Sequence, residues 1–241
     1  MYVNEEEPDI TEPEVSLTFT QGGKGYEVGS EITPKYSASL SPGTYQFGPA
    51  TGITAKSWGI EDSKGQEATT SSGDMPKVTI TDNLEYTITA TAVYGEGAVP
   101  LTNLKKPLPD QKILAGSASK TSTKMTAYRN SFYGTLESKS ELTSDVIRGL
   151  NASNSSLSDG SVKKVNIPLK ALRVVFAYPD TLRDLSSVTD TNGLMAEILS
   201  SFTKITVNVE GNNHYQAIPY NVYYLDYANP NDKANSYTFT I

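Results

Sequence analysis

His214 is the only histidine of this 241-residue chain, so it is the one imidazole that could serve as a catalytic base, and cysteine is absent. A Ser-His-Asp triad would have to use it, and a two-histidine or cysteine-based metal site is excluded. His214 follows the turn-forming sequence Gly211-Asn212-Asn213. We therefore expect an exposed loop histidine, since a catalytic base would also need a nucleophile and an orienting partner.

Two other groups carry oxygen or charge at short spacing. They are Asp226, Asn229, Asn231 and Asp232, and Asp180, Arg183 and Asp184. The first group could surround a calcium ion, but it lacks the regular spacing of a calcium loop, so we expect a turn. The second group predicts a surface ion-pair cluster.

Motifs of catalysis are missing from the sequence: there is no phosphate loop, nucleophile elbow, zinc-protease helix or paired-carboxylate pattern. The sequence therefore predicts no catalytic residue, no cofactor, no metal site and no enzymatic activity. The 15 tyrosines could stack on a glycan, but most fall on the faces of expected strands, which favours packing.

The charge is concentrated at the N-terminus. The net charge is −7, and residues 1–14 hold six acids and no base. The rest of the chain is close to neutral, which argues against a nucleic-acid partner, because such a partner needs clustered positive charge. No apolar run approaches the roughly 18 residues that would span a bilayer, so no membrane insertion is expected.

The pattern along the chain predicts a mainly β protein. Residues 1–14 read as an acidic extended arm, and residues 15–95 as an immunoglobulin-like β-sandwich, because short strands rich in Thr and Tyr alternate with Gly and Pro turns. The clearest strand is 85–94. Trp58 on a middle strand is the expected core anchor, and a binding hot spot is the alternative. Residues 96–124 read as a linker, since Pro and Gly recur there.

That linker and its flank are basic. Residues 103–129 hold six bases against one acid. This stretch could contact an acidic partner, such as the 1–14 arm of a neighbouring copy, or it could be a solvated connector.

Residues 125–241 predict a β-rich α+β domain with one or two short helices. A strand at 124–136 leads into a short helix at 142–150, with Thr143 or Ser144 as the N-cap and Gly149 as the stop. Arg148 is expected to cap the helix or form an ion pair at its end. Residues 172–178 are nearly all apolar, so both faces should be buried, and the strand near 128–136 should pair beside it.

Further strands are expected at 163–168, 204–209, 216–227 and 237–241. Leu194, Ile198 and Phe202 stand at helical spacing, which predicts a helix over 192–202, although a bent strand would also fit.

Several segments carry a resemblance to a known class of proteins. In the second domain they are 128–136, 143–150, 174–179, 209–211 and 217–223, and in the first domain 40–52 and 57–58. Together they resemble structural proteins of tailed bacteriophages that infect gut Bacteroidales, including crAss-like phages. The resemblance implies a virion protein, fibre-like or capsid-associated, with no enzymatic role, and it carries over no binding residue.

The first hypothesis is therefore a non-enzymatic virion structural protein: a head fibre, capsid decoration or tail-associated attachment protein made in the host cytoplasm. Its expected partners are other virion proteins of the capsid, neck or tail, and a host surface glycan or receptor. It is also expected to associate with further copies of itself, as a homotrimer. A bacterial cell-surface adhesin or glycan-binding module is the alternative. A glycan-cleaving enzyme is the third hypothesis, and it would need two carboxylates about 5–10 Å apart in a cleft.

Overall fold

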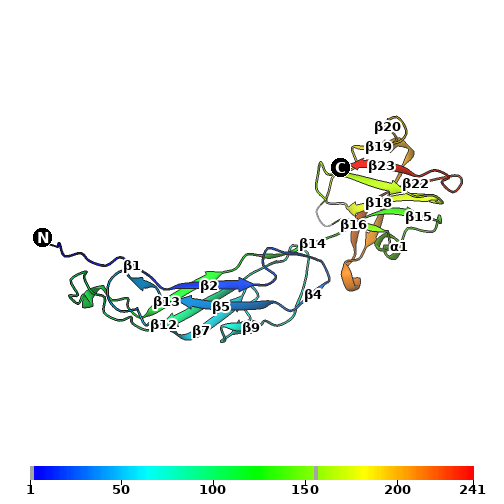
Figure 1. Cartoon of the computed structure of the whole chain (residues 1–241). Coiled ribbons are helices and arrows are strands. Elements are labelled where there is room, and N and C mark those ends of the chain that lie inside the picture. The colour runs from blue at the N-terminus through cyan, green and yellow to red at the C-terminus, as the bar shows by residue number, and fades with distance from the viewer. Residues whose placement is uncertain (1–2, 155–156) are drawn as a thin grey trace. The chain divides into compact units, whose positions relative to one another are not determined.

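The computed structural model describes residues 3–154 and 157–241, and these residues are mainly β, with 46% strand and 6% helix. They form two compact units (Figure 1). The first unit comprises residues 1–25, 31–79 and 84–126, and the second comprises 26–30, 80–83 and 127–241. None of the described helices is long and apolar enough to cross a membrane.

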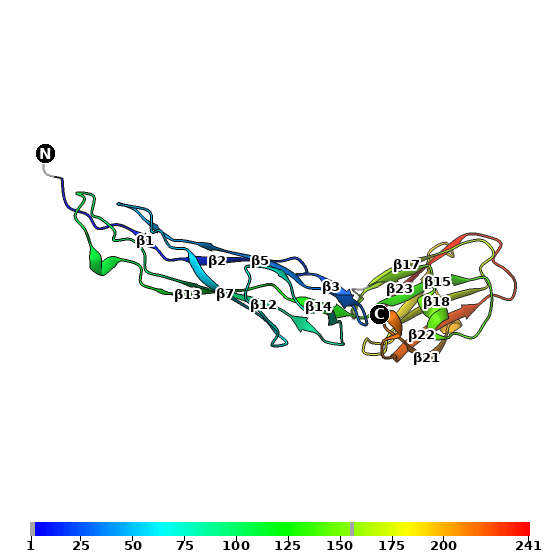
Figure 2. The same ribbon diagram turned by 90° about the horizontal axis from the view of Figure 1, so that it is seen from below.

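The first unit contains two larger antiparallel sheets, drawn as two layers in Figure 2. One has the order β2 (Glu14–Phe19), β5 (Lys35–Ser41), β9 (Ser72–Asp74), and the other β13 (Gly116–Thr121), β12 (Ile88–Tyr94), β7 (Ala55–Asp62), β8 (Glu67–Ala68). β2 contacts both β12 and β13, so the layers face each other.

The strand expected at 85–94 is confirmed, although the structure divides it into β11 (Glu85–Tyr86) and β12. Ile88, Ala90 and Ala92 are fully buried on the inner face, as the alternation predicts. On the outer face the hydroxyls of Thr89 and Thr91 pair with Thr121 and Ser119 of β13 at 2.9 and 2.8 Å.

The remaining strands of this unit and its border are short. They are β1 (Ile10–Thr11), β3 (Gly25–Glu27), β4 (Glu31–Ile32), β6 (Thr44–Tyr45), β10 (Val78–Thr79) and β14 (Met125–Tyr128). β1 pairs with β6, and β4 pairs with β10. A single-turn 3-10 helix, η1 (Pro109–Gln111), follows the proline-rich stretch.

Two expectations for this unit are wrong. Residues 116–121 do not belong to an irregular linker, because their small and hydroxyl side chains fit the outer face of β12 and they form the edge strand β13. Trp58 is not the core anchor: it shares the inner face of β7 with Ile60, but Trp58 is half-exposed whereas Ile60 is 1% exposed. In the register of β7 and β12, Trp58 lies opposite Ala92.

The acidic arm lies against the basic stretch of the same chain. The Asn103 side chain donates to the carbonyl of Asn4 at 2.9 Å and accepts from the amide of Glu6 at 3.0 Å. Lys106 forms a 3.7 Å ion pair with Glu5. The acidic partner considered for this stretch is therefore present within one chain, without a neighbouring copy.

The second unit contains two antiparallel sheets. One has the order β16 (Ala152–Asn154), β15 (Ser131–Leu136), β18 (Arg173–Pro179), β22 (Ile218–Asp226), β21 (Thr203–Val209). The other has the order β17 (Val162–Ile167), β23 (Asn235–Thr240), β19 (Ser187–Asp190), β20 (Ala196–Glu197).

β18 is the central strand, as its apolar sequence predicts, and every residue in it is buried. On one face Phe176 stacks on Phe239 of the second sheet, with ring centroids 4.5 Å apart. On the other face Val175 and Ala177 pack in a cluster that includes Ile147 of α1 (Ser144–Arg148). The predicted neighbour is confirmed too, because β15 pairs with β18 along its length.

α1 confirms the expected short helix. The hydroxyl of Thr143 accepts from the amide of Val146 at 3.4 Å, and Gly149 follows the last turn. Arg148 donates to a carboxylate oxygen of Glu27 at 2.8 Å, so it is the expected ion-pair residue at a helix end.

The helix predicted over 192–202 is wrong. The segment holds a turn, β20 and the 3-10 helix η2 (Leu199–Ser201). Leu194 is fully exposed, whereas Ile198 and Phe202 pack against the core around Phe239, so the three apolar residues do not form the single buried face that would stabilise a helix. The strands expected at 163–168, 204–209, 216–227 and 237–241 appear as β17, β21, β22 and β23.

Residues 26–30 and 80–83 also belong to the second unit, although they lie far from residues 127–241 in the sequence. The amide of Val28 donates to the carbonyl of Tyr128, and its carbonyl accepts from the amide of Asn212 at 2.7 Å. Gly29 has φ +90°, and a Cβ there would lie 1.9 Å from the Asn212 carbonyl oxygen, so only glycine fits this close approach.

Candidate functional site

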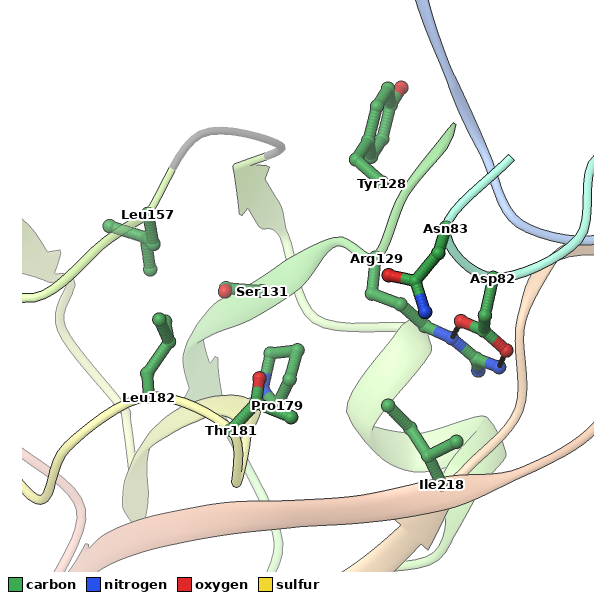
Figure 3. A pocket seen from close by; sticks show the side chains of 10 residues that line it. All are labelled: Asp82, Asn83, Tyr128, Arg129, Ser131, Leu157, Pro179, Thr181, Leu182 and Ile218. Carbon is green, nitrogen blue, oxygen red and sulfur yellow. Dashed lines mark hydrogen bonds and ion pairs between the residues drawn. The ribbon is translucent and has the colours of Figure 1, made fainter. Parts of the chain in front are cut away.

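The second unit has an open pocket of about 400 Å³ beside Arg129 (Figure 3). Its walls come from the 80–83 segment, the β14–β15 connection, the loop after β18 and the start of β22. The lining residues are Asp82, Asn83, Tyr128, Arg129, Ser131, Leu157, Pro179, Thr181, Leu182 and Ile218.

An ion pair fixes one wall of this pocket. The Nε and Nη2 atoms of Arg129 donate to the two carboxylate oxygens of Asp82, both at 2.8 Å, and Nη2 also donates to the carbonyl of Gln216 at 2.9 Å (Figure 3). The Arg129 side chain is only 7% exposed. The hydrogen bonds that Arg129 donates lower the pKa of Asp82 and, by the same interaction, raise the pKa of Arg129, so both groups stay charged.

The rest of the guanidinium is buried. Its centre lies 5.9 Å from the ring of Tyr215, and its Nη1 atom is enclosed, with no hydrogen-bond partner among the described residues. Because Asp82 already neutralises its charge, Arg129 is built as a rigid wall of the pocket and does not offer a free positive charge to a ligand.

The opposite wall is apolar. Leu157 and Leu182 point toward each other in Figure 3, with Pro179 on the same side of the pocket, and Ile218 adds an apolar side chain beside Arg129. Tyr128, whose pKa is raised mainly by burial, adds a half-buried aromatic ring. An apolar wall with a few fixed polar groups is the usual make-up of a site that binds a small ligand or a side chain.

The lining does not resemble a catalytic centre. Ser131 is the most buried hydroxyl in it, at 2% exposure, and no lining residue is a histidine. A serine nucleophile needs a base within hydrogen-bond reach, and the one histidine, His214, lies outside this lining. The arrangement can bind and position a small ligand or a side chain.

His214 is the exposed loop histidine that the sequence predicts. It ends the 3-10 turn η3 (Asn212–His214), its side chain is 82% exposed, and its Nδ1 lies 2.7 Å from a carboxylate oxygen of Glu210.

In the oxygen-rich group at 226–232, Asp226 and Asn231 make structural contacts. Both carboxylate oxygens of Asp226 accept from Arg173, at 2.6 and 2.9 Å, and the side chain of Asn231 donates to the carbonyl of Pro168. Asp226 is thus committed to an ion pair, and the expected turn follows it at 227–234.

The surface cluster predicted at Asp180, Arg183 and Asp184 is wrong in its pairing. Arg183 forms its ion pair with Asp159 at 3.1 Å, and Asp184 pairs with Lys204. Residues 180–184 form a loop after β18, and the charged side chains of this loop pair with neighbouring segments instead of with one another.

Sequence reasoning did not find Asp82 and Asn83. They lie 46 or more residues from Arg129, in a short turn between β10 and β11, and no local pattern links them to it. The tyrosines behave as expected, since the largest buried side chains include Tyr86, Tyr178 and Tyr220.

Comparison of the chain with models of protein families, with curated proteins and with solved structures gave no match.

Proposed function

We propose that the chain is a non-enzymatic structural protein of a bacteriophage virion: a head fibre, a capsid decoration or a tail-associated attachment protein. The observation that carries the proposal is where the phage-like segments lie. Those at 128–136, 174–179 and 217–223 fall largely on β15, β18 and β22, which are neighbours in one sheet. The resemblance thus concerns residues that build the core.

The use of charge supports the same proposal. The three least exposed ion pairs join distant segments: Arg129 to Asp82, Arg173 to Asp226 and Arg148 to Glu27. Charges committed in this way stabilise a frame and are not free for proton transfer. The two facing antiparallel sheets of the first unit are compatible with an immunoglobulin-like sandwich, an architecture common in adhesive and surface domains.

The proposed oligomer is a homotrimer. Leu194 and Met195 are adjacent and 101% and 66% exposed, and Leu169 and Val162 are more than half exposed, so the second unit offers apolar surface to partners. Static light scattering on the purified chain should return three times the mass of the 26.0 kDa chain. A monomer at micromolar concentration would contradict self-assembly in the absence of other virion proteins.

The virion proposal is tested by locating the protein. Antibodies against the purified chain should label particles of the phage whose genome encodes it, and electron microscopy should place the label on the capsid, neck or tail. Labelling confined to bacterial membranes, with clean particles, would refute the proposal.

The Arg129 pocket favours a second candidate, a glycan-binding or adhesive module, because it combines an aromatic ring, fixed polar groups and an apolar wall. Thr181 lies at the rim and is exposed, so Thr181→Trp should fill the pocket without disturbing the core. Saturation-transfer NMR with host-surface oligosaccharides should show binding to the wild type, and to a Thr203→Trp control on the edge strand β21, but not to Thr181→Trp. Equal signals from all three proteins would exclude this pocket.

A further inference from the structure

A second cluster of potential ligands lies outside the pocket described above. Asp145, Glu210 and His214 each offer one ligand atom, and these atoms lie within 4.8 Å of one another. They border a hollow of about 420 Å³ that is also lined by Arg148 and by the loop 211–213. We propose that this cluster binds a divalent transition-metal ion of the zinc type, through one imidazole nitrogen and two carboxylates.

The frame that holds the three side chains is fixed from several sides. The amide of Glu210 donates to the hydroxyl of Ser144 at 3.0 Å, and its carbonyl accepts from Arg148 at 2.8 Å, so both ends of this peptide are tied to α1, which carries Asp145. Little backbone ordering is therefore needed when an ion binds.

The loop that carries His214 is held as well. Asn212 donates through its amide to the carbonyl of Val28 and through its side chain to Ser30, and the side chain of Asn213 donates to the carbonyl of Gly29 at 3.1 Å. These contacts hold Asn213 and His214 at φ +50° and +55°, which few non-glycine residues adopt. The turn thereby presents His214 beside Glu210.

The spacing of the donor atoms suits an ion of this class. Ligands about 2.1 Å from a tetrahedral zinc ion lie roughly 3.4 Å apart. The imidazole and the Glu210 carboxylate are 2.7 Å apart, so they must separate by about 0.7 Å to admit the ion. That movement is small for His214, whose side chain is 82% exposed.

Charge and donor type select the ion. The carboxylate of Asp145 makes no hydrogen bond or ion pair with any residue in the described ranges 3–154 and 157–241, so it is free to coordinate. Arg148, the nearest cation in the hollow, is paired with Glu27, which leaves two carboxylates to balance a dication. An imidazole ligand favours zinc, nickel or copper over magnesium or calcium.

Isothermal titration of the full chain with Zn²⁺ tests the proposal. The wild type should bind one ion, and His214→Ala, Glu210→Gln and Asp145→Asn should each weaken binding at least tenfold. Asp180→Asn, which removes an exposed carboxylate elsewhere in the same unit, should leave binding unchanged. Circular dichroism should show that each variant keeps the wild-type fold, because the three ligand side chains lie outside the apolar core.

Two further readouts separate a built site from general attraction to acids. Co²⁺ should give visible d–d absorption bands with the wild type that are absent with His214→Ala. Mg²⁺ should bind much more weakly than Zn²⁺, because magnesium prefers oxygen ligands and water to an imidazole nitrogen. Unchanged Zn²⁺ affinity in His214→Ala, no binding by the wild type, or equally tight binding of Mg²⁺ would each overturn the proposal.

Discussion

Arg173→Met is expected to lower the free energy of unfolding of the second unit by about 2–4 kcal/mol at neutral pH. The guanidinium of Arg173 donates twice to Asp226, at 2.6 and 2.9 Å, and once to the carbonyl of Ser140 at 2.6 Å. Three charge-assisted hydrogen bonds at about 1.5–3 kcal/mol each set an upper limit. The Asp226 side chain is 32% exposed, so water compensates part of the loss.

Urea denaturation followed by far-UV circular dichroism measures this change. Trp58, the only tryptophan, belongs to the first unit, so its fluorescence reports that unit separately. Arg183→Met is the matched control, because Arg183 is 81% exposed in its pair with Asp159 and should cost less than about 0.5 kcal/mol. A loss below about 1 kcal/mol for Arg173→Met would refute the view that this pair anchors the central strand.

The penalty should also depend on pH. The hydrogen bond from Arg173 lowers the pKa of Asp226 in the folded state. A lowered folded pKa gives stability that is present above the unfolded value, about 3.9, and is lost as the pH falls through the folded value. The difference between wild type and Arg173→Met should therefore be constant from pH 5 to 8 and shrink below pH 4. A difference that grew in acid would contradict the sign of this linkage.

Two further substitutions probe the cores. Phe176→Ala should lower the free energy of unfolding of the second unit by about 3–5 kcal/mol, because Phe176 is 1% exposed and stacks on Phe239. Urea denaturation measures this loss, and a loss below about 1 kcal/mol would mean that the two sheets do not pack there. Tyr86→Phe should lower the free energy of unfolding of the first unit by about 1–3 kcal/mol, because the Tyr86 hydroxyl donates to buried Asp62 at 2.7 Å. Trp58 fluorescence follows the unfolding of this unit, and an unchanged free energy would show that water replaces the bond.

The fold was predictable from sequence where local pattern and burial agree. The apolar run at 172–178 predicts a strand buried on both faces, and Thr143 with Gly149 predicts the limits of α1, because such signals depend on neighbours in the chain. The errors arise where tertiary context decides. β13 is stabilised by its pairing with β12 and its contacts with β2, both distant in sequence, and no sequence pattern places Leu194 in solvent.

The candidate sites were less predictable. Arg129 and Asp82 are 47 residues apart, and Asp145 is 69 residues from His214, so each site exists only after distant loops meet. The turn character and exposure of His214 could be predicted, but its two acidic neighbours could not. Strands and helix caps can be predicted from neighbouring residues. These loops, in contrast, are brought together by the pairing of β21 with β22 and by the packing of α1 against β21.

The recruitment of residues 26–30 into the second unit has a consequence for synthesis. Val28 is bonded to Asn212, which is made 184 residues later. At about 5–20 residues per second, Val28 would be translated roughly 10–40 s before its partner. Arg148, the partner of Glu27, is made 121 residues after it, and until Asn212 is made Gly29 has no backbone to approach. The second unit is thus completed only after most of the chain has been made, and a gene fragment starting at residue 127 would encode it without Glu27 and Asp82.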